Sequence, residues 1–202
     1  MIRARIITTI AAISLLCVSS LAAMAQNQAP EAAFGPRAGK PQPPEIVGTF
    51  EKWSLTCDNL PAPNPKDPKA EPIMVRSCGL VQSVRDEKNP NLGLSMVIVK
   101  TKENGEDVYM VRIMAPIGVF LPLGVALEID GEAVSRVPFS RCAPQTCVAM
   151  GPASAETLGK FKKGKQATFI IYDNPGQGFP LVIDLAGITA ALEALDKEAA
   201  KK

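Results

Sequence analysis

Cysteine is the residue type in this chain whose spacing points most directly to chemistry. Cys142 and Cys147 are separated by four residues, within a stretch (residues 137–150) that has apolar flanks around a proline-bearing loop. Two thiols at this spacing can close a disulfide ring or exchange a disulfide with a substrate. The spacing is C-x4-C, whereas thiol–disulfide enzymes use C-x-x-C, and no helix N-terminus obviously follows either sulfur. We favour a structural ring that fixes a chain reversal, with disulfide exchange as the alternative.

The sequence contains no histidine. This absence excludes a Ser-His-Asp triad, a Cys-His dyad, an H-E-x-x-H zinc site and a histidine pH switch. The G-x-S-x-G and S-x-x-K motifs of hydrolases are also missing. We therefore expect a protein that is not an enzyme, with no catalytic residues, no cofactor and no metal ion.

Residues 1–25 are predicted to be a signal peptide. Arg3 and Arg5 precede an apolar run over residues 6–21, and Ala23-Met24-Ala25 forms a cleavage site. An uncleaved membrane anchor is the alternative, which the Thr and Ser residues within the run disfavour. Cleavage after Ala25 would leave no membrane span, and it would remove Cys17, so that the mature chain keeps an even number of cysteines.

Removing the signal peptide also changes the charge balance. Without Arg3 and Arg5 the 22 basic residues become 20, equal to the 20 acidic residues. A near-neutral chain lacks the basic footprint of a nucleic-acid-binding protein. We expect no nucleic-acid partner.

The chain after the signal peptide divides into a leader and one domain. Residues 26–45 are rich in Ala, Gln and Pro and are predicted to be disordered. Residues 46–198 form the predicted domain, since a chain of this length supports one substantial core. Trp53, Leu55 and Cys57 alternate with polar residues and predict a half-buried strand with Trp53 in the core.

The second cysteine pair would close a proline-rich segment. Five prolines lie between Cys57 and Cys78, and they predict a surface loop because proline disrupts both helices and β-ladders. Four cysteines allow three pairings. We favour Cys57–Cys78 with Cys142–Cys147, because each pair is local and spans a proline-containing loop.

The middle of the chain is a series of predicted strands at residues 73–84, 92–101 and 108–114, separated by turns at residues 89–91 and 103–105. In the third strand, the alternation of Met110, Arg112 and Met114 suggests a core face more than an adaptable binding face. Asp130-Gly131 predicts a further turn, and the implied register leaves a bulged or longer turn open.

An apolar segment with two bends supplies the candidate contact surface. Pro-x-Gly-Val occurs at residues 116–119 and again at residues 122–125, and each copy suits a turn. Ile117, Phe120 and Leu123 are the candidate contact patch on these bends. The alternative, a loop that covers one end of the core, is somewhat favoured by the sequence.

The last part of the chain predicts two helices around a hairpin. Ser154 is the predicted N-cap of a short helix that ends before Gly164. Residues 166–173 and 181–185 are predicted strands joined by a turn. Ile188, Ala191, Leu192 and Leu195 have the spacing of a C-terminal amphipathic helix. The pattern predicts an all-β, antiparallel immunoglobulin-like β-sandwich of about seven to nine strands with one or two short helices.

Five short motifs occur in order along the chain. They are F-x-x-W-x-L-x-C at residues 50–57, C-x-L-x-Q at 78–82, P-L-G-V-x-L-x-I-D at 122–130, P-F-x-x-C-x-x-x-x-C at 138–147 and G-I-x-x-A-L-x-x-L at 187–195. This series resembles the invasion-associated locus B family of Gram-negative bacteria over residues 46–196. The resemblance implies an exported β-sandwich protein linked genetically to host-cell invasion, and it supplies no catalytic residues.

These observations together predict an exported, non-enzymatic envelope or surface accessory protein. It would be periplasmic or secreted to the cell surface, would bind an unknown protein or envelope partner, and could aid interaction with a host cell. The alternative function is periplasmic thiol–disulfide exchange through Cys142 and Cys147. The sequence sets no oligomeric state.

Overall fold

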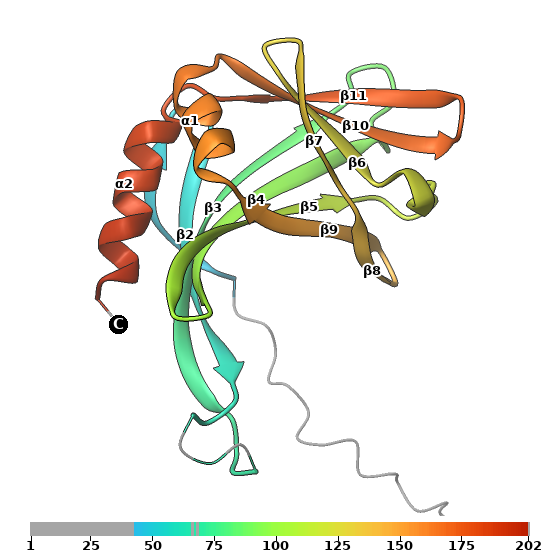
Figure 1. Ribbon diagram of the computed structural model, residues 1–202. Coiled ribbons are helices and arrows are strands. Elements are labelled where there is room, and N and C mark those ends of the chain that lie inside the picture. Colours follow the sequence, from blue (N-terminus) through green and yellow to red (C-terminus); the bar gives the residue numbers. More distant parts are fainter. Residues whose placement is uncertain (1–42, 66, 68, 202) are drawn as a thin grey trace, which may run out of the picture. The chain divides into compact units, whose positions relative to one another are not determined.

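The alternating apolar runs form two antiparallel sheets in the computed structural model, which describes residues 43–201 apart from residues 66 and 68 (Figure 1). The large sheet contains, in spatial order, β1 (Glu45–Phe50), β2 (Trp53–Ala62), β3 (Ile73–Arg85), β4 (Gly93–Glu103), β5 (Glu106–Ala115), β9 (Thr146–Ala153) and β8 (Phe139–Ala143). The small sheet contains β11 (Gln177–Asp184), β10 (Gln166–Asn174), β6 (Val125–Ile129) and β7 (Glu132–Val137). The antiparallel β-sandwich expected from the sequence is confirmed.

The described residues form more strands than the sequence indicated. Eleven are present, where the alternating runs predicted about seven to nine. One extra strand arises because residues 45–62 reverse direction at Glu51, which has a φ of 53°. Another arises because the predicted cysteine ring is itself a hairpin of two strands, β8 and β9.

The predicted tight turns form as the side-chain chemistry requires. Asn104-Gly105 joins β4 to β5, and Asp130-Gly131 joins β6 to β7, with positive φ at all four residues. Such a conformation is compatible with the right-handed twist of the paired strands. In the second hairpin the pairing register shifts at a bulge between Leu127 and Glu128. Because of this shift, Val125 lies opposite Val137.

The core lies between the sheets and under the helices. Trp53, Leu80, Met96 and Ile113 are fully buried on the large sheet, so the core position expected for Trp53 is confirmed. The expectation for the methionine stripe of β5 is wrong. Val111, Ile113 and Ala115 are the buried set, and Met110 and Met114 lie half-buried on the opposite face.

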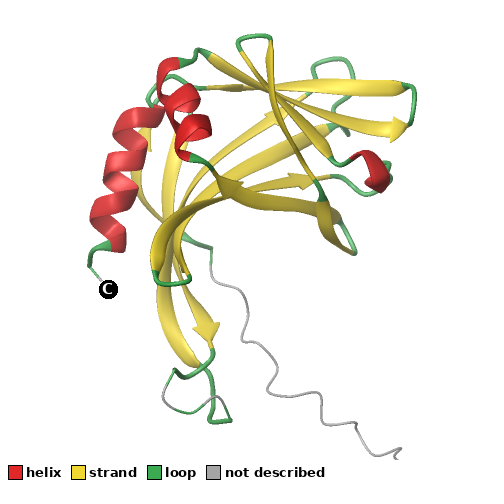
Figure 2. Cartoon of the chain, viewed as in Figure 1, coloured by secondary structure: helices red, strands yellow, loops and turns green. Residues whose placement is uncertain are grey.

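Both predicted helices form and cover the core (Figure 2). Helix α1 (Ala155–Lys163) begins at Ser154, whose Oγ accepts a hydrogen bond from the Thr157 N–H at 3.1 Å, and it buries Phe161 completely. Helix α2 (Ile188–Ala199) packs on β1 to β4 through the four apolar residues that the sequence singled out. Gly187 precedes α2 with a φ of 79°, and a side chain there would collide with the Phe50 carbonyl.

A buried amide connects the two sheets. Gln82 on β3 donates from Nε2 to the Asp184 carbonyl on β11 at 2.8 Å, and its Oε1 accepts from the Asp184 N–H at 2.9 Å. Trp53 Nε1 donates to the same carbonyl at 3.1 Å. The polar groups between the sheets are therefore satisfied by each other, which the burial of an amide requires.

The predicted signal peptide and nearly all of the predicted leader lie outside the described residues. Glu45, placed at the end of the leader by the sequence, belongs to β1. Within the part of the chain that the structure describes, no helix is long and apolar enough to cross a bilayer.

Candidate functional site

The C-x4-C segment forms the outermost hairpin of the large sheet. Cys142 on β8 and Cys147 on β9 lie opposite each other and are joined by a disulfide, with Pro144 and Gln145 at the turn. This is the pairing that the sequence favours. The two sulfur-bearing residues differ in environment, because Cys142 is exposed whereas Cys147 is only 3% exposed.

The two Pro-x-Gly-Val copies bend the chain as expected, by different means. The first turns at Ile117-Gly118, and the second is a short 3-10 helix, η1 (Leu121–Leu123), followed by Gly124. Both glycines have positive φ, and a side chain at Gly124 would also collide with the Val137 carbonyl. The sequence therefore needs glycine at both bends.

The three residues of the candidate contact patch are not equally accessible. Ile117 is 58% exposed, whereas Phe120 and Leu123 are half-buried. The Phe120 N–H donates to the Tyr172 carbonyl at 2.6 Å, and Arg136 Nη1 donates to the Leu123 carbonyl at 2.6 Å. Leu121, which the sequence did not single out, is 45% exposed. The segment thus holds one flank against the small sheet and presents Ile117 and Leu121 outward.

Two adjoining hollows lie beside these bends, where the β3–β4, β5–β6 and β8–β9 loops meet the strands of the β10–β11 hairpin. We call this region the loop end. One hollow, of about 600 Å³, is lined by residues that include Arg85, Gln145 and Thr146. The other, of about 220 Å³, is lined by residues that include Ile117 and Tyr172. The linings of both hollows include Asn91 and Pro116, so the two form one continuous surface.

The chemistry of the loop end suits binding. Its polar groups are mainly amides and hydroxyls from Asn, Gln, Ser and Thr residues, beside an apolar rim that includes Ile117 and Phe179. The two Ser hydroxyls in the larger hollow, of Ser83 and Ser95, already bond to each other at 2.7 Å. Such a surface can form hydrogen bonds and apolar contacts with a partner.

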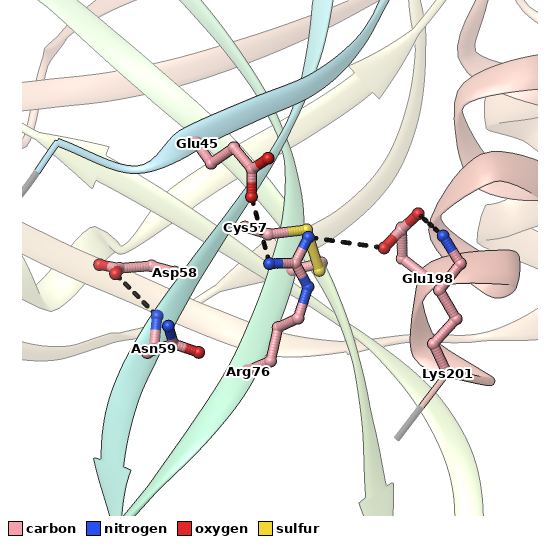
Figure 3. Close-up of polar contacts among 8 residues, drawn as sticks. Glu45, Cys57, Asp58, Asn59, Arg76, Glu198 and Lys201 are labelled. Carbon is pink, nitrogen blue, oxygen red and sulfur yellow. Dashed lines mark hydrogen bonds and ion pairs between the residues drawn. A yellow bond between two sulfur atoms is a disulfide. The ribbon is translucent and has the colours of Figure 1, made fainter.

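The second disulfide joins β2 to β3 beneath the end of α2. Cys57 and Cys78 lie opposite each other, with only 2% and 9% of their surfaces exposed. Glu198 lies close enough for the three residues to surround a metal ion. The two sulfurs are bonded to each other, however, and Glu198 pairs with Arg76 at 3.7 Å and with Lys201 (Figure 3). The arrangement acts as a structural staple.

The titratable groups with altered pKa values fasten elements together. Asp196 on α2 accepts hydrogen bonds from Tyr109 Oη at 2.6 Å and from Lys100 Nζ at 2.9 Å. Burial, together with the hydrogen bond to the Asp196 carboxylate, raises the pKa of Tyr109 to about 12. The hydrogen bond to Asp196 also raises the pKa of Lys100. Lys100 neutralises the Asp196 carboxylate, and the hydrogen bonds from Lys100 and Tyr109 hold α2 on β4 and β5.

Asp184 on β11 also has an altered pKa because it holds structural elements together. The Ala186 N–H donates to Asp184 Oδ1 at 2.9 Å, and Lys52 forms an ion pair with the other carboxylate oxygen at 3.2 Å. The backbone hydrogen bond first, and then Lys52, lower the pKa of Asp184. The charged form therefore stabilises the turn that leads into α2.

The sequence did not indicate which loops assemble at the loop end. It marked residues 89–91 and 144–145 as turns or loop, but these turns are far apart in the chain, and only the sheet order brings them together. Tyr172 was indicated only as part of the predicted strand at residues 166–173, and Phe179 was not singled out. Turn chemistry could locate each loop, but no local signal places one loop beside another.

Comparisons with known proteins agree with this architecture. The crystal structure of invasion associated protein B from Bartonella henselae matches with a TM-score of 0.58 and 19% sequence identity, covering 79% of this chain and 99% of that one. This likeness supports the fold. No match is found among curated proteins. The family model described as invasion associated locus B (IalB) protein matches residues 53–196, from Trp53 on β2 to Asp196 on α2. The chain therefore belongs to the invasion associated locus B family.

Proposed function

We propose that this protein is an exported, non-enzymatic accessory protein of the cell envelope or cell surface, and that it binds a protein or envelope partner through the loop end. The observation that carries the proposal is that exposed Ile117 lines the smaller of two adjoining hollows, whose polar groups are mainly uncharged amides and hydroxyls. An apolar rim beside convergent polar groups is typical of binding surfaces.

The positions of the titratable groups with altered pKa values, which lie outside the two hollows, support a binding role. The groups whose pKa values are clearly altered, such as Tyr109, Lys100 and Asp184, pair at the helix contacts described above. In enzymes such groups usually gather at the reactive centre. Their structural roles here, and the chain's lack of histidine, favour binding over catalysis.

Site-specific photo-crosslinking in intact cells tests the loop end. A crosslinking residue at Ile117 is expected to capture a defined partner that the same residue at exposed Glu193 on α2 does not capture. Ile117→Asp should then abolish binding of that partner to the purified protein without lowering the melting temperature. Equal capture from both positions, or unchanged binding by Ile117→Asp, would contradict the proposal.

We place the protein in the periplasm or on the outer surface. Two disulfides and family membership support export, because disulfides persist in oxidising compartments. Cell fractionation, followed by protease treatment of intact cells, distinguishes the two locations. Protein recovered in the cytosol with reduced cysteines would contradict export.

Interaction with a host cell is the finer role that we propose for this binding. The name of the Bartonella henselae relative, invasion associated protein B, supports it. Purified protein should bind host-cell surfaces saturably, and Ile117→Asp should reduce that binding at least about tenfold. Binding that is absent, or equal for both forms, would restrict the role to the envelope.

Disulfide exchange is the second candidate function. The observation in its favour is the asymmetry of the hairpin pair, in which exposed Cys142 is open to attack and buried Cys147 is shielded. Equilibration in glutathione buffers, with each bridge mapped by mass spectrometry, tests it. A structural bridge should have a reduction potential below about −300 mV. Reduction at milder potentials, with transfer of the disulfide to a substrate, would establish the exchange function.

A further inference from the structure

The β2–β3 hairpin extends beyond the rest of the large sheet as a two-stranded ribbon (Figure 1). We call residues 58–62 and 73–77 the arm. Among the described residues, β1 pairs with β2 only as far as Cys57, and β4 pairs with β3 only as far as Gly79. The arm therefore has two free edges, and a hairpin without neighbouring strands is only marginally stable in water.

The arm exposes apolar side chains on both strands. Met74 is 63% exposed, Leu60 is 46% exposed and Ile73 is 40% exposed. These are three of the seven large apolar residues that are exposed in the described part of the chain. An exposed apolar ribbon with free edges is a surface on which another strand can pair.

The hydrogen-bonding pattern shows which main-chain groups face outward. Cys57 and Cys78 lie opposite each other with Cα atoms 4.0 Å apart, the short spacing of a non-hydrogen-bonded pair. Because the two kinds of pair alternate, Asn59–Arg76 and Pro61–Met74 are also non-hydrogen-bonded pairs. The main-chain groups of these four residues therefore point away from the opposing strand of the arm.

The two edges differ in their ability to accept another strand. On the β2 edge, the Asn59 N–H already donates to Asp58 Oδ1 at 2.7 Å (Figure 3). Pro61, on the same edge, has no N–H to offer. On the β3 edge, both Met74 and Arg76 retain an outward N–H and carbonyl, and residues 73–77 contain no proline. The β2 edge is blocked and the β3 edge is open.

The open edge is complementary to itself. If two copies of residues 73–77 run antiparallel about a twofold axis at Val75, then Met74 of each copy lies opposite Arg76 of the other. Each of these two pairs can exchange an N–H···O bond in both directions, and no other sequence is needed to satisfy the edge. We propose that the β3 edge of the arm pairs with the same edge of a second copy, forming a twofold dimer through a continuous four-stranded ribbon.

The blocked edge explains why such pairing would stop at two copies. A ribbon with two open edges could add strands indefinitely, whereas proline and local side-chain bonds at an edge prevent further pairing. In the dimer both outer edges of the ribbon are β2 edges, protected by Pro61 and by the Asp58–Asn59 bond. The pairing therefore closes, as twofold contacts do.

The arm is also held in position for pairing. The Cys57–Cys78 disulfide fixes its base. Arg76 pairs with Glu45 on β1, at 3.2 Å from Oε2, and forms a longer ion pair with Glu198 on α2 at 3.7 Å (Figure 3). Anchoring the ribbon by a disulfide at its base and by ion pairs to two other elements lowers the conformational entropy lost on association. The inference concerns the arm and does not depend on the function proposed for the loop end.

Sedimentation equilibrium tests the dimer by comparing the full exported chain with variants altered at the open edge or at the blocked edge of the arm. Met74→Pro removes an outward N–H and should weaken dimerisation about tenfold or more, whereas Asn59→Pro, on the blocked edge, should leave it unchanged. Both positions are non-hydrogen-bonded within the arm, so the hairpin should remain folded in both variants.

Two substitutions of opposite charge at Met74 test the strand register of the proposed dimer. Met74→Lys should weaken the dimer because it places a cation opposite Arg76 of the second copy, and Met74→Glu should preserve or strengthen it. The Met74 and Arg76 amide protons should also exchange more slowly as the protein concentration rises.

Three results would overturn the proposal. The first is a monomer at every concentration, with these amides exchanging freely. The second is a monomer in which they are protected, which would show that another segment of the chain covers the edge. The third is a dimer that none of the Met74 substitutions affects, since it would have to use another surface.

Discussion

At the scale of single residues, Gln82 connects the two halves of the sandwich. It is the one buried polar side chain among the described residues, at 5% exposure, and both ends of its amide bond to the main chain of Asp184. The Asp184 N–H depends on this acceptor. The connection between the sheets therefore depends on amide chemistry at a position that is otherwise apolar.

We predict that Gln82→Met lowers the free energy of unfolding by about 1–3 kcal/mol, because it leaves a buried N–H without an acceptor. Urea denaturation at neutral pH measures the change. Gln177→Met, at an exposed strand position, is the matched control and should be nearly neutral. A loss of stability that is the same in both variants would show that the hydrogen bonds to Asp184 are not the cause.

Tyr109 gives the protein a predictable response to alkali. Burial and the Asp196 carboxylate raise its pKa to about 12, above the ordinary value of 10.0. The unfolded chain therefore releases this proton at a lower pH than the folded chain does. The stability linked to neutral Tyr109 is complete below pH 10 and is lost as the pH rises towards 12. The raised pKa of Lys100 acts in the same direction.

We expect ultraviolet absorbance of tyrosinate to show a transition near pH 12 that Tyr109→Phe removes and Tyr172→Phe retains. Unfolding measured between pH 9 and about pH 11 should also depend less on pH in Tyr109→Phe than in the wild type. A tyrosinate transition near pH 10 assigned to Tyr109 would mean that α2 does not shield it.

At the scale of elements, the two disulfides differ in the length of the loop that each closes and in their position relative to the core. Cys57–Cys78 spans 21 positions in sequence and lies in the core beneath α2. Cys142–Cys147 spans five positions and closes an edge hairpin. On the chain-entropy model, a longer closed loop contributes more stability.

We therefore predict that Cys57→Ser/Cys78→Ser lowers the unfolding free energy by about 3 kcal/mol or more, and Cys142→Ser/Cys147→Ser by about 2 kcal/mol. Thermal or urea unfolding of both double variants provides the comparison. The edge variant should keep the core intact, as judged by the fluorescence of buried Trp53. A larger loss from the edge pair than from the core pair would contradict this ranking.

At the scale of the whole molecule, the remaining prediction concerns export. Ala23-Met24-Ala25 follows an apolar run with a basic start, so we predict that the mature protein begins at Gln26. Intact-mass spectrometry of exported protein measures this directly. Ala23→Leu/Ala25→Leu, which enlarges the small residues of the cleavage site, should leave the precursor uncleaved. A mature chain that retains Met1, or that carries a lipid on Cys17, would contradict the prediction.

Much of the fold was predictable because its signals are local. Asn104-Gly105 and Asp130-Gly131 adopt the positive φ values that tight hairpins require, and Ser154 and Gly164 bound α1 as their capping preferences indicate. The cysteine pairs are local as well, and each joins strands that are neighbours in the sheet. Each of these features depends on a few adjacent residues, whose conformational preferences do not need the rest of the chain.

Tertiary structure decided everything that depends on burial or on contact between distant segments. Alternation along β5 defined two faces, but only the packing of the small sheet and α2 makes Val111 and Ile113 the core and leaves Met110 and Met114 outside. The packing of the strands gathers three separate loops and the β10–β11 hairpin at the loop end, and the end of pairing at Cys57 and Gly79 leaves the arm exposed. Local propensity specifies how a segment bends and alternates. What covers the segment depends on contacts between residues distant in sequence.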